Sequence, residues 1–566
     1  MGKSILVLYT SSNLVSDDKD CDTCANNLEH PISPSEHDVD KLLAELAPMI
    51  DSGRCRCLTS DGGAAWRLTT RQRVNILHLV CTYGPVGLID DLLEAGCDPN
   101  EPTPATGTTP LHYLCRSESI PSDEAVAAVD KLLGRGVDVN SVDRRRNGAL
   151  HLAINNRNSQ LAMLLIDRGS CLDVVNDRGE TPLLISTGQS MEQVVMELCQ
   201  MGADPNTKDD NMMLALNVAI YKYNKKMVVA LLDNPRVDVD QLGVCKNGHV
   251  MTPPLLLAAS CGYDEAVELL LDKGAAVDCV DEYDNSPLIL AACVDDLDTV
   301  RLLLAHNADA NLAHPDGYGP LHFAAWEGHS DICRLLMEAG GAPVNGTTND
   351  GSTPLALACH DDYTDTVELL LDHGADVNIR NDDGQAAIHY CAYNGNLNLV
   401  TLLLGRGADP DVENRLGVTP LWNAVYAAAP AVVRLLIQCN VRLDVPSKGV
   451  EQAAERPFLI FDQPRTPLYV ACTKNPSLVR VLVLAGVRLE RETWLLAGNI
   501  PEELAVDCEL YDWLMRQATR PPSLLRITRE VLRRLIGINP HDKVQGLQLP
   551  REMKDFLVLK SFPGDL

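Results

Sequence analysis

Basic residues are scarce in this chain, which has 48 lysines and arginines against 78 aspartates and glutamates and a formal net charge of −30. A protein that follows the phosphates of a nucleic acid needs a basic face, and an anionic membrane surface makes the same demand. We therefore expect neither nucleic acid nor a membrane among the partners. A basic protein segment is compatible with this charge, although an acidic surface that only keeps a large protein soluble explains it equally well.

Catalytic and membrane-spanning signatures are also missing. No stretch approaches the roughly 18 consecutive apolar residues of a transmembrane helix, and we find no HExxH, GxSxG, complete phosphate loop or RING-like ligand array. Cys21 with Cys24 and Cys55 with Cys57 would offer four thiolates to zinc, but the unusual spacing favours free thiols. We expect a non-catalytic protein with no cofactor and no bound metal.

A disulfide framework is not indicated by the 19 cysteines, which are odd in number and lack a framework spacing. Several stand where the repeats described below have small helix residues, as at Cys81, Cys359 and Cys472, so we expect buried thiols in a reducing compartment. The apolar run at residues 5–9 is too short for the core of a signal peptide. The prediction is a cytoplasmic or nuclear protein.

Aromatic residues make up only 4% of the chain, whereas 46% of its residues are hydrophobic, so small apolar side chains must form the core. Residues 319–329 show how this is done. Pro320 suits the first position of a helix, apolar residues follow, and Gly328 ends the helix because it tolerates a positive φ. A second helix has apolar residues at i, i+3 and i+4 from Ile332. Such a unit is too small to bury its own apolar face, so it needs a copy of itself on either side.

Copies of this unit recur through most of the chain, mostly at spacings of 33 or 34 residues. The residues aligned with one another are Ile76, Pro110, Ala149, Pro182, Ala215, Pro254, Pro287, Pro320, Pro354, Ala387, Pro420 and Pro467. A period near 33 with T-P-L-H-x-A and a closing G-A-D-x-N, as at residues 202–206 and 374–378, is typical of ankyrin repeats. Residues from about 72 to about 490 thus resemble the ankyrin-repeat family, which implies an all-α solenoid of about twelve repeats with short hairpin turns.

The predicted organisation has five parts. These are a flexible N-terminal segment (1–37), an N-terminal capping region (38–71), the repeat array (72–490), a C-terminal capping helix (491–520) and a small helical domain (521–566). The capping helix itself is expected at residues 501–515. An insertion at residues 445–465 carries Phe458 and Phe461 in a connection that is normally polar. It either folds back onto the array or serves as a recognition loop.

One position of the first helix is not needed for stacking and should point toward the concave side of the array. It holds a ring in four consecutive repeats of this aromatic-poor chain: Trp326, His360, Tyr393 and Tyr426. Acidic residues lie close by, among them Asp361 and Asp382. We call these six residues the capture stripe and predict that they bind a substrate segment with apolar and basic side chains. The alternative, on equal terms, is that the rings only pack against neighbouring turns.

The last part of the chain differs from the repeats in its chemistry. Residues 523–536 predict a basic amphipathic helix, and residues 547–550 precede a last short helix. This part resembles a SOCS box, so the whole chain is similar to the ankyrin-repeat and SOCS-box family. The resemblance assigns Elongin binding to Leu524, Thr528 and Leu532, and cullin binding to Leu547, Leu549 and Pro550. Thr528 replaces a cysteine of the family and Gln548 a proline, which bears on Elongin affinity and on the choice of cullin.

The resemblance implies a substrate-recognition subunit of a cullin-RING ubiquitin ligase. The SOCS box would bind Elongin B/C and the cullin-RING scaffold, and the array would capture a protein substrate that the sequence does not name. Such a subunit is not an enzyme, because it contributes only the proximity of a substrate lysine to a ubiquitin-conjugating enzyme. The alternative is a non-degradative ankyrin scaffold or inhibitor whose C-terminal helices only cap the array.

Overall fold

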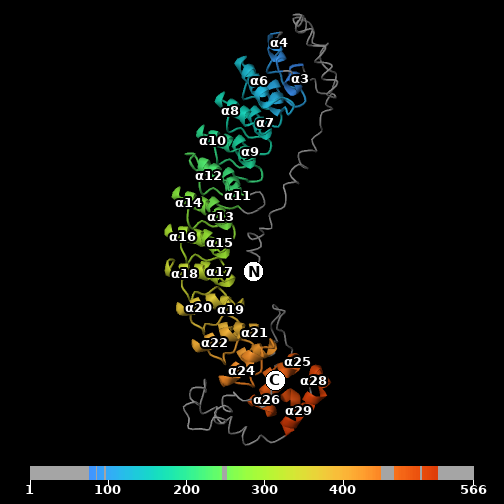
Figure 1. The fold of residues 1–566 in the computed structure, drawn as a ribbon, viewed down its shortest axis with the longest axis vertical. Coiled ribbons are helices and arrows are strands. Elements are labelled where there is room, and N and C mark those ends of the chain that lie inside the picture. Colours follow the sequence, from blue (N-terminus) through green and yellow to red (C-terminus); the bar gives the residue numbers. More distant parts are fainter. Residues whose placement is uncertain are drawn as a thin grey trace. The chain divides into compact units, whose positions relative to one another are not determined.

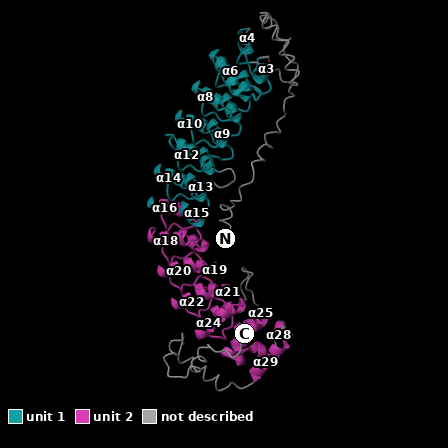
Figure 2. Ribbon diagram, in the orientation of Figure 1, with its two compact units in different colours: residues 1–294, 305–307 teal, residues 295–304, 308–566 magenta. Residues whose placement is uncertain are grey.

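The computed structural model describes residues 76–84, 86–94, 97–244, 251–447, 465–497 and 500–519. These residues form helices, turns and isolated β-bridges but no strand, which confirms the predicted all-α class. The chain divides into two compact units (Figure 2). Unit 1 comprises residues 1–294 and 305–307, and unit 2 comprises residues 295–304 and 308–566.

The described residues contain twelve helix pairs. The first helices are α3 (Ile76–Tyr83), α5 (Pro110–Arg116), α7 (Ala149–Asn155), α9 (Pro182–Gly188), α11 (Ala215–Tyr221), α13 (Pro254–Ser260), α15 (Pro287–Cys293), α17 (Pro320–Glu327), α19 (Pro354–His360), α21 (Ala387–Asn394), α23 (Pro420–Tyr426) and α25 (Pro467–Lys474). The second helices are α4 (Leu88–Glu94), α6 (Ser122–Gly134), α8 (Ser159–Asp167), α10 (Glu192–Gln200), α12 (Lys225–Leu232), α14 (Asp264–Asp272), α16 (Leu297–Ala305), α18 (Ser330–Glu338), α20 (Thr364–Asp372), α22 (Leu397–Gly405), α24 (Pro430–Gln438) and α26 (Pro476–Ala485).

Every first helix begins at the residue that the sequence alignment of the repeats predicts. Capping explains this register. Thr353 precedes α19, and its hydroxyl accepts a hydrogen bond from the Ala356 N–H at 3.2 Å. Thr419 does the same for the Trp422 N–H of α23 at 3.3 Å. Proline at the first helical position adds a preset φ and has no N–H to leave unpaired.

Like helices stack on like within each unit. In unit 1, α5 packs on α7 and α6 on α8, and in unit 2, α19 packs on α21 and α20 on α22. The first and second helices therefore form two rows within a unit (Figure 1). The buried core consists mainly of leucine, valine, isoleucine and alanine. It includes Cys359 and Cys391, two of the 14 free cysteines in the described residues, which agrees with the predicted buried thiols.

The end of the array differs from the prediction of one capping helix at residues 501–515. The chain forms a 3-10 turn, η2 (Leu489–Arg491), then α27 (Thr493–Leu496), α28 (Glu502–Val506) and α29 (Cys508–Thr519). The break has a local cause, because the Asp507 carboxylate accepts a hydrogen bond from the Leu510 N–H at 3.0 Å and so starts a new helix. α28 packs on α25 and α29 packs on η2, with Leu504, Leu510 and Leu514 buried.

Several predicted segments lie outside the described residues. They are the N-terminal segment and capping region, the phenylalanines of the 445–465 insertion and the domain at 521–566. Across the part of the chain that is described, no helix combines the length and the apolar character that crossing a membrane requires.

Candidate interaction site

The four rings of the capture stripe occupy equivalent places on successive first helices of unit 2. Trp326 lies in the last turn of α17, and His360, Tyr393 and Tyr426 lie at or near the ends of α19, α21 and α23. Their exposure differs. Tyr393 is 50% exposed and the His360 side chain 59% exposed, whereas Trp326 and Tyr426 are half-buried. The stripe thus combines two solvent-facing rings with two rings that also serve packing.

The stripe rings make contacts with one another and with rings outside the stripe. Tyr393 and Tyr426 stack with centroids 6.2 Å apart and an interplanar angle of 19°. Tyr426 in turn stacks on Trp422, a fully buried ring, at 5.4 Å. His360 meets Tyr390 edge-on at 5.5 Å. The three first helices α19, α21 and α23 therefore carry neighbouring aromatic contacts, with one ring fixed in place by the core beneath it.

Trp326 is held by a different contact. Its indole lies 5.7 Å from the ring of Tyr318, which precedes α17. Partial burial raises the pKa of the Tyr318 phenol, and the negative charges of Asp350 and Asp316 raise it further. An aromatic surface beside carboxylates that already disfavour negative charge is suited to cationic side chains.

The two acidic members of the stripe take different positions. The Asp361 carboxylate lies 3.2 Å from Nδ1 of His360, directly beside the ring. Asp382 lies on a hairpin tip, is exposed, and has its carboxylate 3.9 Å from the Arg415 guanidinium. The structure thus places Asp361 at the rings, whereas Asp382 contacts both neighbouring hairpins, since its N–H also donates a hydrogen bond to the Asp350 carbonyl at 2.7 Å.

The charge around the rings is negative beyond these two residues. Tyr363 ends the turn after α19 as the residue that precedes α20, and its pKa is raised by partial burial and by the negative charges of Glu327 and Asp361. The Asp362 carboxylate accepts a hydrogen bond from the Asn396 side chain at 3.2 Å, which links the turns after α19 and α21. These residues extend the acidic edge along unit 2.

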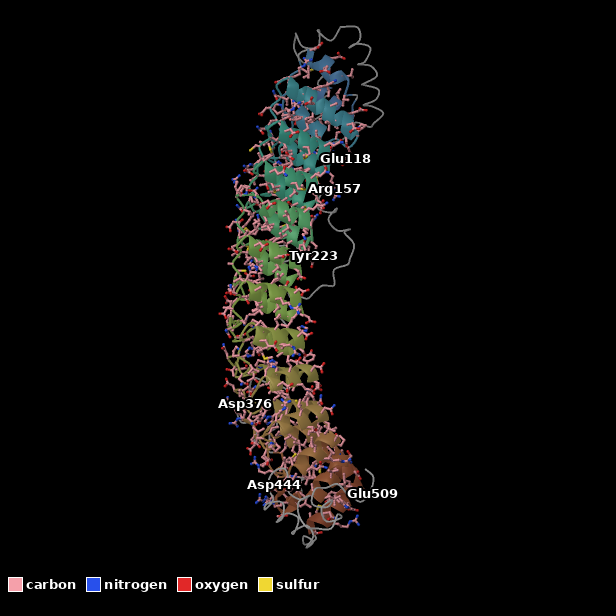
Figure 3. The ribbon with its side chains drawn as sticks, turned by 60° about the vertical axis from the view of Figure 1, so that its left-hand side comes forward. Glu118, Arg157, Tyr223, Asp376, Asp444 and Glu509 are labelled. Carbon is pink, nitrogen blue, oxygen red and sulfur yellow. The ribbon has the colours of Figure 1, made fainter. Side chains whose placement is uncertain are left out.

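Sequence reasoning missed Tyr318 and Tyr390, which support Trp326 and His360. Tyr390 stands one helical turn before Tyr393 on the same helix, and this i, i+3 relation was a signal that the two rings share a face. It also missed a tyrosine pair in unit 1, where Tyr223 and Tyr263 have centroids 5.2 Å apart. Tyr223 is 55% exposed and lies with Glu118 and Arg157 along one edge of unit 1, in the loops between paired helices (Figure 3).

In some repeats a buried histidine ties the hairpin to the helix before it. Nδ1 of His389 accepts a hydrogen bond from the Ala386 N–H at 3.1 Å, so its proton lies on Nε2, which is 3.1 Å from the Val418 carbonyl of the next repeat. Burial lowers the pKa of this imidazole to about 4. His322 makes the same pair of contacts, with the Gly319 N–H at 3.2 Å and the Gly346 carbonyl at 3.0 Å. These neutral histidines hold the hairpin tips that flank the stripe.

The predicted Elongin- and cullin-binding residues, and the four cysteines considered for zinc, lie outside the described residues. Within the described ranges, no group of three or more histidine, cysteine or carboxylate residues is placed to hold a metal ion. The site that the structure does describe is therefore a surface of rings and carboxylates.

Comparison with known proteins gives the array its family. A family model described as ankyrin repeats (3 copies) matches seven overlapping segments, which together span residues 122–493, more than half of the chain. The chain is an ankyrin-repeat protein. Ankyrin repeats are modules of protein–protein interaction, so the array binds protein partners.

Relatives of this ankyrin-repeat protein match only part of its chain. The human transient receptor potential cation channel subfamily A member 1 is 26% identical over 222 residues, 38% of this chain and 16% of the channel. The mouse B-cell lymphoma 3 protein homolog is 32% identical over 223 residues, 38% of this chain and 49% of that protein. The putative palmitoyltransferase ZDHHC13 of Danio rerio is 28% identical over 236 residues, 41% of this chain and 30% of its own. The ankyrin-repeat protein thus covers less than half of each of these relatives.

Proposed function

We propose that this ankyrin-repeat protein is the substrate-recognition subunit of a cullin-RING ubiquitin ligase of the Elongin B/C type. In this proposal, residues 521–566 form a SOCS box that recruits Elongin B/C and the cullin-RING scaffold, and the array captures the substrate. The protein does no covalent chemistry itself and acts by raising the local concentration of a substrate lysine at the conjugating enzyme.

The observation that carries the proposal is the resemblance of the C-terminal segment to a SOCS box, combined with an array that already has a cap. α28 and α29 cover the last repeat and bury Leu504, Leu510 and Leu514. Capping the array therefore does not require the basic amphipathic sequence at residues 523–536. This supports a partner-binding role for that sequence over the alternative of a scaffold whose C-terminal helices only cap the array.

The first test measures binding of Elongin B/C to the purified full-length protein. We compare wild type, Leu524→Ala and a truncation that ends at Arg520, with Tyr283→Ala as a control for surface substitution in the array. We expect wild type and Tyr283→Ala to bind and the other two proteins not to bind. If wild type does not bind Elongin B/C, the proposed ligase role is wrong, and the scaffold becomes the better proposal.

For the substrate, we propose that the capture stripe binds a segment rich in basic and apolar side chains. Two exposed or half-exposed rings, Trp326 and Tyr393, offer apolar faces, and Asp361 adds a negative charge beside them. A cation above such a ring is attracted by about 0.5–2 kcal/mol, and truncating a central aromatic of an interface costs roughly 2 kcal/mol or more.

The test for this site uses two labelled peptides, one alternating arginine with leucine and one alternating glutamate with leucine. We expect the arginine peptide alone to bind, with an affinity that falls as salt is raised. Trp326→Ala combined with Tyr393→Ala should abolish binding, whereas Tyr283→Ala, which removes an exposed ring of unit 1, should not. A melting temperature lowered by many degrees in the double variant would instead assign the two rings to the core.

A further inference from the structure

Lysine is absent from the stretch between Lys273 and Lys448, although the chain has 15 lysines and 33 arginines. The stretch comprises 174 residues, begins two residues after the end of α14, and includes all the residues of the capture stripe. All of it is described by the structure, and much of its surface is exposed. The absence therefore concerns accessible positions where lysine is an ordinary residue.

Charge does not explain the absence. Seven arginines remain in the same stretch: Arg301, Arg334, Arg380, Arg406, Arg415, Arg434 and Arg442. An acidic surface reserved for a basic partner would exclude both cations alike, since both repel such a partner. What the stretch excludes is the primary amine alone.

Geometry does not explain the absence either. Arg406 follows α22, and its guanidinium lies 2.8 Å from the carboxylate of Asp372 in the preceding repeat. In unit 1, Lys273 follows α14 and makes the equivalent contact with Asp233 at 3.0 Å. Lysine thus fulfils the same ion pair in the same fold, and arginine is not required for it. The pairs are exposed, so their energies are small with either cation.

With charge and geometry set aside, lysine and arginine still differ in the nucleophilicity of their side chains. A deprotonated lysine amine attacks the thioester carbonyl that joins ubiquitin to the cysteine of a conjugating enzyme. The carbon–nitrogen bond forms, the carbon–sulfur bond breaks, the cysteine leaves as a thiolate, and the amine gives up one proton to water. A guanidinium stays protonated at all accessible pH values and does not take part in this step.

We infer that residues 274–447 face the ubiquitin-transfer zone of the assembled ligase, and that their lack of lysine keeps the receptor from being modified in place of its substrate. This inference rests on the proposed function. The stretch presents the substrate, so its own side chains share the high local concentration of the charged conjugating enzyme. The lysines of the described residues before the stretch, such as Lys131 and Lys226, all lie in unit 1.

The experiment introduces lysine amines into the stretch without changing the net charge of the protein. The triple variant Arg334→Lys, Arg380→Lys and Arg406→Lys places amines at three exposed positions of the stretch. The matched control is Arg168→Lys, because Arg168 follows α8 and, like Arg406 after α22, pairs with a carboxylate of the preceding second helix, here Asp130 of α6. Each full-length protein is assembled with Elongin B/C and the cullin-RING scaffold and incubated with ubiquitin, activating enzyme, conjugating enzyme and ATP. Modified lysines are mapped by mass spectrometry.

We expect the triple variant to be self-modified at one or more of the three introduced amines, at least about tenfold more than wild type and the control, since proximity decides the rate. Equal modification of the triple variant and wild type would overturn the inference, and so would equal modification at the control position. Two further readouts separate this failure from failure of the proposed function: binding of Elongin B/C, and discharge of the conjugating enzyme onto free lysine. If wild type fails in both, the proposed function is wrong and the inference falls with it.

Discussion

The buried imidazole of His389 makes the repeats of unit 2 less stable in acid. The free energy lost on protonation can be worked out from the structure. The ring is 1% exposed and neutral, with Nδ1 accepting one hydrogen bond and Nε2–H directed at a carbonyl of the next repeat. Protonation of Nδ1 replaces the first hydrogen bond by a clash of two N–H groups. The group therefore stabilises the fold fully above its unfolded pKa of 6.5, and this contribution is lost as the pH falls toward the folded pKa of about 4.

The magnitude follows from the difference between these two pKa values. At about 1.4 kcal/mol per unit, protonation of this one side chain can cost up to roughly 3 kcal/mol, of which about 2 kcal/mol is already lost at pH 5. Burial is the main cause of the lowered pKa, and the positive charge of Arg380 adds to it. Four other histidines of the described residues, His78, His112, His151 and His322, have pKa values lowered by burial in the same way.

The assay compares wild type, His389→Gln and His360→Gln by hydrogen exchange of the peptides that cover α21 and α23, at pH 7 and at pH 5 and constant ionic strength. Correction for intrinsic exchange rates gives the local free energy of opening at each pH. The position accepts other side chains, since Leu256 and Ile289 occupy it in other repeats. His360 is the control because it is exposed.

We expect wild type and His360→Gln to lose about 2 kcal/mol more than His389→Gln between pH 7 and pH 5. At pH 7 the His389→Gln protein should be less stable than wild type by roughly 1–2 kcal/mol, because it loses one of two buried hydrogen bonds. If His389→Gln and wild type respond equally to pH, the ring does not titrate as a buried neutral group, and the explanation is wrong.

Two further substitutions test local features of the array. Gly328→Ala should lower the free energy of unfolding by more than Gly374→Ala does. Both glycines have a positive φ, at 81° and 86°, which costs alanine about 1–2 kcal/mol, but only at Gly328 would the new methyl group overlap the Tyr363 ring. Equal urea midpoints of the two variants would show that the ring moves aside freely. Glu492→Gln should raise the stability at pH 7, because burial raises the pKa of this carboxyl, which accepts two hydrogen bonds through a single oxygen. The advantage should be lost as the pH falls, since the wild-type carboxyl then becomes neutral. A variant less stable than wild type at pH 7 would mean that the hydrogen bonds from Thr466 and Trp494 to the carboxylate outweigh the cost of its burial.

The repeat register was determined by the sequence alone. Each first helix starts at the proline or alanine, or at Ile76, that the 33-residue period aligns, because the capping residues that start a helix lie within four residues of one another. The burial of Cys81, Cys359 and Cys472 followed from the same alignment, since a small residue at that helix position faces the next repeat. Because the same helix-starting and small core residues recur at the same positions of each repeat, tertiary contacts do not alter where the helices begin.

Exposure of the candidate site was decided only by the tertiary structure. Trp422 and Tyr426 lie one turn apart on α23, yet the first is fully buried, with its N–H 3.0 Å from a carbonyl of residue 465, and the second is half-buried. Tyr393 on the preceding helix is 50% exposed. The sequence aligned Tyr393 with Tyr426, but the exposure of each ring depends on which side chains the adjoining repeat and its hairpin place against it. The break between α28 and α29 at Asp507 also depends on tertiary contacts beside its local cap, because α28 packs on α25 and α29 on η2. The sequence signals that start and end each helix act within one repeat, whereas the binding surface and the end cap depend on contacts between repeats.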